Sequence, residues 1–79
     1  MTPEQARQMI KDILREIAPD SDPDTLPGDA DLRDSLELDS LDFLNFVEEL
    51  AQRSGRRIDE DDYPKLATLA SGAAFLARS

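Results

Sequence analysis

The strongest constraint on the fold is a stripe of apolar residues with a helical period at the start of the chain. From Ala6 to Ile17, apolar residues follow one another at spacings of three and four, so they share one face of an α-helix. The preceding residues suit a helix start, because they supply a cap, a proline for the first helical position and a capping-box partner: Thr2, Pro3 and Gln5. Pro19 disfavours helical backbone at Ala18. We therefore expect an amphipathic helix that ends near Ala18.

A long loop is expected after this helix. Residues 19–38 contain three of the five prolines and many aspartates, and such clusters are typical of loops. A long loop without structure of its own is uncommon in a small domain and is often functional. We expect its leucines to attach it to the core, namely Leu26, Leu32, Leu36 and Leu38.

A second main helix and a short helical turn are expected next. The second helix is predicted from about residue 40 to 53, because Asp39 is a suitable N-cap and Gly55 a suitable residue just beyond the end. Residues 59–63 are expected to form one short helical turn that Pro64 ends.

Thr68 is expected to cap a last helix. Its predicted apolar face holds Leu69, Gly72, Ala73 and Leu76, with Phe75 at the edge. The fold class predicted from these elements is a small all-α four-helix bundle, with three main helices, one short helix and a long loop between the first two. At 79 residues, the chain is expected to form a single domain that spans residues 1–79.

The composition argues against several classes of function. The chain has no cysteine and no histidine, which removes disulfides, thiol catalysis, the commonest zinc ligand and the commonest general base. A serine hydroxyl is a weak nucleophile without an adjacent base, so we expect neither an enzyme nor a metal centre. No apolar stretch is long enough to span a membrane, and the charged N-terminal residues do not form a signal peptide. We expect a cytoplasmic monomer.

Acidic charge is concentrated in the segment that contains Ser40. The net charge of the chain is −9, and residues 20–42 hold nine acidic residues with a single basic one, Arg33, for a net charge of −8. Nucleic acid is a poor partner for such a surface. A basic surface on another protein is complementary to it.

Leu41 is expected on the polar side of the second helix. At about 100° per residue, it lies about 140° from the centre of the apolar stripe that the later residues of this helix form. Leu36, Leu38, Phe43 and Leu44 are instead expected to pack. An exposed leucine among acids beside Ser40 is typical of a contact surface, although Asp39-Ser40 by itself also fits ordinary helix capping.

These features together resemble the acyl carrier protein family, also known as phosphopantetheine-attachment or thiolation domains. The resemblance covers nearly the whole chain, including its length, its acidity and the long loop after the first helix. Its motifs are Leu36, Asp39-Ser40-Leu41-Asp42, Glu48-Glu49-Leu50, Ile58 with the acidic cluster after it, and Leu69-Ala70-Ser71-Gly72-Ala73. The resemblance implies that Ser40 carries a covalent 4′-phosphopantetheine arm, which a phosphopantetheinyl transferase installs from coenzyme A. The thiol of the arm would then hold an acyl or aminoacyl group as a thioester.

The resemblance also implies a docking face on the second helix and no catalytic residue. Enzymes with basic patches would bind this face: the transferase, ligases that activate acyl groups or amino acids, and acyl-transferring enzymes. The matching positions are Asp39, Leu41, Asp42, Asn45, Glu48 and Glu49. The implied function is transport of acyl groups in fatty-acid, polyketide or other specialised biosynthesis.

Several residues depart from the pattern of the fatty-acid-synthesis carriers. Asn45 stands where those carriers usually have a glutamate, and Glu37 where a glycine is common. Phe43 and Phe46 replace smaller branched residues, and a basic stretch follows: Arg53, Arg56 and Arg57. These departures favour a specialised carrier with its own ligase, such as a dedicated amino-acid carrier, and a short acyl or aminoacyl cargo.

Two alternatives belong to other classes of protein. One is an acidic helical module that binds a basic partner and is never modified. The other is a calcium sensor, because Asp20, Asp22, Asp24 and Asp31 have part of the spacing of a calcium-binding loop. Thr25 stands where that loop needs glycine, and Pro23 interrupts it, so the calcium alternative is the weaker one.

Overall fold

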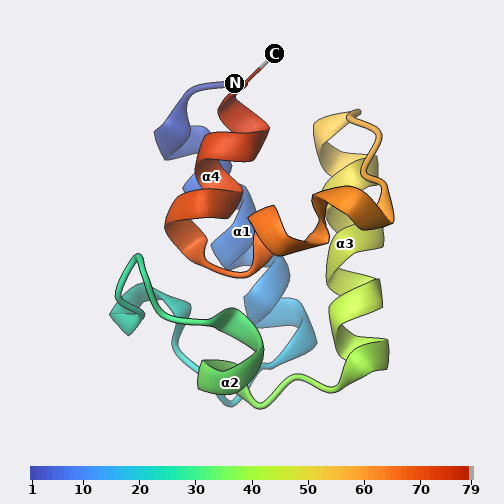
Figure 1. Cartoon of the computed structure of the whole chain (residues 1–79). Coiled ribbons are helices and arrows are strands. Elements are labelled where there is room, and N and C mark those ends of the chain that lie inside the picture. The colour runs from blue at the N-terminus through green and yellow to red at the C-terminus, as the bar shows by residue number, and fades with distance from the viewer. Residues whose placement is uncertain (79) are drawn as a thin grey trace.

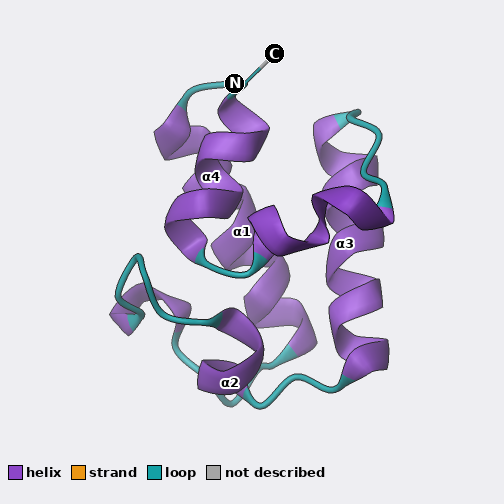
Figure 2. Ribbon diagram, in the orientation of Figure 1, coloured by secondary structure: helices purple, strands orange, loops and turns teal. Residues whose placement is uncertain are grey.

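Helices make up most of the described chain. The computed structural model describes residues 1–78, and within that range the only strand-like feature is an isolated bridge between Asp31 and Thr68. The segments are α1 (Pro3–Ile17), η1 (Pro23–Thr25), α2 (Leu32–Leu36), α3 (Ser40–Ser54), η2 (Glu60–Leu66) and α4 (Leu69–Ala77) (Figure 2). The predicted all-α bundle is confirmed. No helix within residues 1–78 has the length and apolar character needed to cross a bilayer.

The helix α1 is the centre of the packing. It lies against both α3 and α4, and η2 lies against α4 (Figure 1). The predicted stripe of α1 faces this core, which contains the fully buried side chains Ile10, Ile13, Leu14, Leu32, Phe46, Leu50 and Leu66. Burial of each such side chain contributes about 1.5–3 kcal/mol. The start of α1 and the end of α4 lie at one end of the bundle, whereas α2 and the start of α3 lie at the other (Figure 1).

The predicted helix ends form in the structure. Thr2 accepts a hydrogen bond from the backbone N–H of Gln5 at 3.1 Å, and the Gln5 side chain accepts one from the N–H of Thr2 at 3.0 Å. Asp39 caps α3 by accepting a bond from the N–H of Asp42 at 2.7 Å. Gly55 follows α3 in the left-handed conformation, with φ of 68°. These contacts satisfy backbone groups that a helix end leaves without partners.

The loop between α1 and α3 contains two short helices, η1 and α2, which the sequence signals did not predict. Five residues, the length of α2, are too few for a helical period to be visible. Backbone hydrogen bonds attach this loop to the α4 region, from Leu32 to the Ala67 carbonyl at 2.8 Å and from Ala70 to the Gly28 carbonyl at 2.9 Å. Its leucines contact the core as expected, with Leu32 and Leu38 buried and Leu26 and Leu36 partly buried.

Two details predicted for the C-terminal segments are wrong. Pro64 lies inside η2 instead of ending the helical turn. It contributes its carbonyl, which accepts a hydrogen bond from Ala67 at 3.3 Å, so its missing N–H does not interrupt the 3₁₀ pattern. Phe75, expected at the edge of the apolar face of α4, is buried. The cationic groups of Arg56 and Lys65 lie 4.4 and 5.5 Å from its ring centroid and cover it.

Candidate functional site

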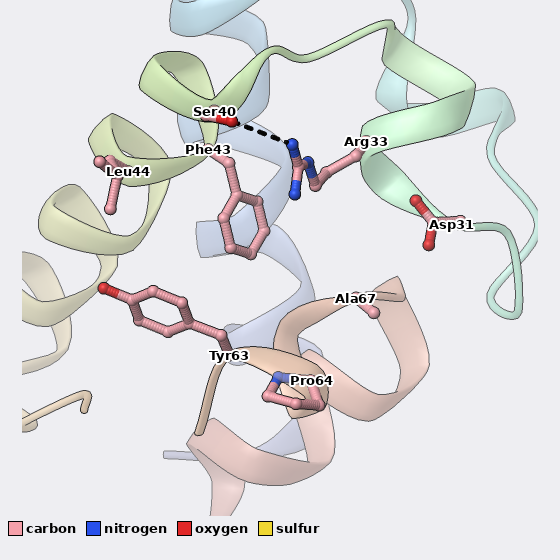
Figure 3. Close-up of a pocket in the computed structure, with 8 residues that line it drawn as sticks. All are labelled: Asp31, Arg33, Ser40, Phe43, Leu44, Tyr63, Pro64 and Ala67. Atoms are coloured by element: carbon pink, nitrogen blue, oxygen red, sulfur yellow. Dashed lines mark hydrogen bonds between the residues drawn. The ribbon is translucent and has the colours of Figure 1, made fainter. Parts of the chain in front are cut away.

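Ser40 is the first residue of α3, and its hydroxyl has no part in capping that helix. Asp39 provides the cap, so the Ser40 side chain is exposed and available. Its Oγ accepts one hydrogen bond, from the guanidinium Nη2 of Arg33 at 3.4 Å (Figure 3). The positive end of the helix dipole and the free N–H groups of the first turn favour an anion at this position.

An open pocket of about 460 Å³ lies beside Ser40, between α3 and η2. Its wall is mostly apolar and is formed by Phe43, Leu44, Tyr63, Pro64 and Ala67 (Figure 3). The rings of Phe43 and Tyr63 meet edge to face, with centroids 5.8 Å apart, an arrangement that stabilises aromatic pairs. The pocket could hold a small apolar group that is tethered at Ser40.

The predicted docking residues lie along α3. Leu41 is 66% exposed, which confirms that it lies off the apolar stripe. Asp39, Asn45 and Glu48 are also exposed, whereas Asp42 and Glu49 are half-buried. Asn45, Glu48 and Glu49 line a groove of about 250 Å³ that α1 completes. The structure thus places five of the six on α3 and Asp39 at its N-cap, but not all in one environment.

The prediction that Leu44 packs in the core is wrong. Its side chain is 42% exposed, although it lines the pocket beside Ser40. Leu44 lies about 80° from the centre of the apolar stripe on the helical wheel, so its partial exposure has a visible cause in the sequence. It adds a second exposed leucine to the surface around Leu41.

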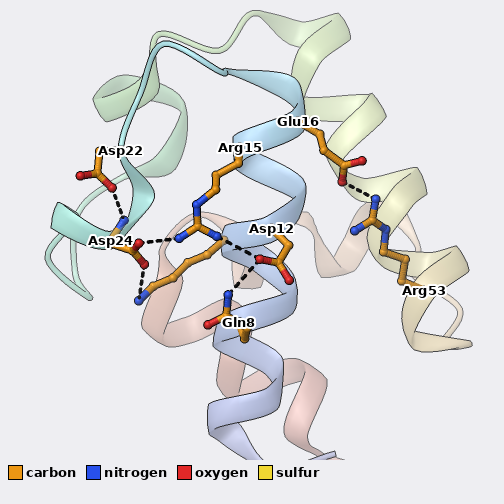
Figure 4. A network of polar contacts seen from close by, with 8 residues as sticks. Gln8, Asp12, Arg15, Glu16, Asp22, Asp24 and Arg53 are labelled. Carbon is orange, nitrogen blue, oxygen red and sulfur yellow. Dashed lines mark hydrogen bonds and ion pairs between the residues drawn. The ribbon is translucent and has the colours of Figure 1, made fainter.

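Arg53 pairs with part of the acidic surface of α3. Its Nε donates to Glu49 at 3.0 Å, and its Nη2 donates to Glu16 of α1 (Figure 4). The hydrogen bond to Glu16 is the main cause of a raised pKa for the Arg53 guanidinium. Glu49 of the docking residues and Glu16 beside them are therefore already paired within the protein. The pair of Glu49 with Arg53 has the i,i+4 spacing of a helix, whereas no local sequence pattern indicates the pair with Glu16, which is far from Arg53 in the chain.

Three of the four aspartates considered for calcium binding have other partners. Asp24 bonds to Arg15 at 2.5 Å and lies 3.5 Å from the Lys11 ammonium (Figure 4), and the Arg15 hydrogen bond lowers the pKa of Asp24. Asp22 caps η1 and Asp31 caps α2. Within residues 1–78, no group of three or more acidic side chains is placed to hold a metal ion.

Comparisons with known proteins identify the family and a similar fold. Residues 4–76 match a family model described as "Phosphopantetheine attachment site". The chain is 30% identical over 76 residues to an acyl carrier protein of Lactobacillus johnsonii, a match that covers 96% of this chain and 94% of that protein. Its fold is similar to the solved structure of an acyl carrier protein from Enterococcus faecalis, with a TM-score of 0.74, 24% identity and coverage of 98% of this chain and 96% of that one.

Proposed function

This chain belongs to the acyl carrier protein family of phosphopantetheine-attachment domains, and on that premise we propose that it carries acyl or aminoacyl groups on an arm attached to Ser40. The observation that best supports this residue is its hydroxyl, which is exposed at the start of a 15-residue helix and is not needed for capping. A phosphodiester fits there, because the helix start favours an anion and the adjacent Arg33 guanidinium is a cation.

The chain's own part in attachment is to present the Ser40 hydroxyl to a transferase. A new bond from Oγ to phosphorus replaces a P–O bond in the pyrophosphate of coenzyme A, so that adenosine 3′,5′-bisphosphate leaves. The hydroxyl proton goes to a base on the transferase, since this chain has no histidine. Once attached, the arm supplies a thiol on which an acyl group is held as a thioester. The protein therefore acts as a carrier and not as an enzyme.

The exposed side of α3 serves as the docking face in this proposal. Leu41 and Leu44 supply apolar contacts, and the surrounding carboxylates attract basic partner surfaces. Among the carboxylates of α3 itself, that of Glu48 is the most exposed. Such charge complementarity mainly increases the rate of encounter and selects the partner. Asn45 lowers the charge at the centre of this face, which supports partners that differ from those of the fatty-acid-synthesis carriers.

We further propose a short acyl or aminoacyl cargo and specialised biosynthesis. Phe46 is fully buried, and Phe43 forms a wall of the pocket beside Ser40. These two rings fill space between α3 and its neighbours that a long acyl chain would need. Incubation of the modified protein with a panel of acyl- and amino-acid-activating ligases tests this. Preferential loading of long fatty acids would contradict it.

Intact mass spectrometry tests the attachment site. The wild-type protein, incubated with coenzyme A and a broad-specificity transferase, is expected to gain the mass of one phosphopantetheine arm. Ser40→Ala should gain nothing, whereas the matched control Ser35→Ala, which alters an exposed serine of α2, should be modified like the wild type. Absence of modification in the wild type would favour the unmodified interaction module. Modification of Ser40→Ala would place the arm elsewhere.

A further inference from the structure

Arg33 has an unusual position for its charge. It is the only basic residue in the segment 20–42, and its guanidinium lies at the Ser40 hydroxyl. Its Cζ is 5.4 Å from the centroid of the Phe43 ring, so the ring supports one side of the group. Among the described residues, 1–78, no carboxylate lies within ion-pair distance of Arg33, although this segment is rich in aspartate.

The contact between Arg33 and Ser40 leaves hydrogen-bonding capacity unused. The Nη2–Oγ distance of 3.4 Å exceeds the range of about 2.7–3.2 Å that is usual for N–H···O bonds. A guanidinium carries five N–H donors in a fork that matches the two free oxygens of a phosphodiester. A neutral hydroxyl oxygen can satisfy little of this fork, whereas a phosphate bonded to the same oxygen could accept two bonds from it.

We propose that Arg33 is a positioning residue that binds the phosphodiester of the arm on Ser40. This inference rests on the proposed attachment at Ser40. The phosphodiester brings a further negative charge to a segment that already has a net charge of −8, directly beside Asp39. Arg33 offsets that charge at the point of attachment, in a contact between a guanidinium and a phosphate that is stronger than one between neutral groups.

The position of Arg33 also gives the arm a direction. Arg33 and Ser40 both line the pocket beside α3, together with Phe43 (Figure 3). In Figure 3 the Arg33 guanidinium lies beside both Ser40 and the Phe43 ring. A phosphodiester bound by Arg33 is thereby held on the pocket side of Ser40, so the arm starts from that side.

The test compares unmodified and modified forms of the wild type and three variants: Arg33→Gln, Arg33→Lys and Arg57→Gln. Arg57→Gln is the matched control for charge, because Arg57 is 87% exposed and follows the far end of α3. A helix of 15 residues places that end about 22 Å from Ser40. Mass spectrometry first establishes that each protein carries the arm, which tests the proposed function separately. Phosphorus NMR is then measured on the modified forms, whereas the Arg33 Nε–H NMR signal and urea unfolding are measured on both forms.

In the wild type we expect the Arg33 Nε–H NMR signal to shift on modification. The phosphorus resonance should differ between the wild type and Arg33→Gln but not between the wild type and Arg57→Gln. For each protein, the unfolding equilibrium constant is compared with and without the arm. The factor by which modification raises this constant should be about two- to fivefold larger for Arg33→Gln than for the wild type, the range expected for one accessible charge pair. Arg33→Lys should fall between them, because a lysine keeps the charge but lacks the fork.

If modified Arg33→Gln has the phosphorus resonance of the wild type and responds to modification as Arg57→Gln does, Arg33 does not bind the phosphodiester. That result leaves attachment at Ser40 intact, since the mass gain already measures it. If the wild type gains no mass, the proposed function and this inference are both rejected.

Discussion

Glu37 is held in a backbone conformation that glycine adopts more easily, and Glu37→Gly should therefore stabilise the protein. Its φ and ψ are 54° and 43°, and Glu37 is the only non-glycine residue with positive φ in residues 1–78. This left-handed residue ends α2 and allows the N–H of Leu38 to reach the Arg33 carbonyl at 2.9 Å. The side chain is exposed, so the substitution removes little packing.

The expected gain follows from two opposing terms. The left-handed conformation costs a residue with a Cβ about 1–2 kcal/mol. Replacing Glu37 by glycine removes that cost. It also destabilises the protein by about 0.4–1 kcal/mol, because glycine gives the unfolded chain more conformational freedom. The free energy of unfolding should thus rise by about 0.5–1 kcal/mol, which corresponds to about 3–6 °C in Tm for a domain of this size. The measurement is urea unfolding with an unchanged m value.

Two control variants separate strain from charge. Glu37→Ala removes the same negative charge but keeps a Cβ, so it should gain less than Glu37→Gly. Gly55→Ala, at φ of 68° with no atom within 4 Å of the added Cβ, should lose about 1 kcal/mol from conformation alone. If Glu37→Ala stabilises the protein as much as Glu37→Gly does, relief of repulsion in the acidic segment is the cause and the conformational reasoning fails.

Two further predictions concern the ion pairs. The hydrogen bond from Arg15 lowers the pKa of Asp24 from its ordinary value of 3.8, so this pair contributes stability above that pH and loses it as the pH falls through the lowered value. Asp24→Asn should therefore have a lower urea midpoint than the wild type at neutral pH, and this difference should close as the pH falls through the lowered pKa of Asp24. A difference in urea midpoint that is as large in strong acid as at neutral pH would contradict the assignment. Arg53→Gln releases Glu49 and Glu16 and should increase the association rate with a basic transferase about two- to threefold at low salt. An association rate that is unchanged at low salt would show that these carboxylates lie outside the docking face.

Most of the helical framework was predictable because its signals are local. A cap such as Thr2 acts on residues within one turn, and an apolar period such as that of α1 needs only the residues of one helix. The same reasoning placed Leu41 outside the stripe of α3. The departure of Glu37 from the family pattern was visible in the sequence as well, although only the backbone angles show why glycine is common at that position.

The sequence by itself determined the class of fold, the main helix ends, the family and the acidic segment around Ser40, because each depends on residues close together in the chain or on composition. The tertiary structure decided which side chains are covered and which charges meet. Phe75 is covered by Arg56 and Lys65, which come from outside α4. Arg53 is paired with Glu16 because α1 packs against α3, and the Arg33 guanidinium of α2 meets the Ser40 hydroxyl at the start of α3. Contacts of this kind depend on how separate segments pack, and no local pattern in the sequence encodes that packing.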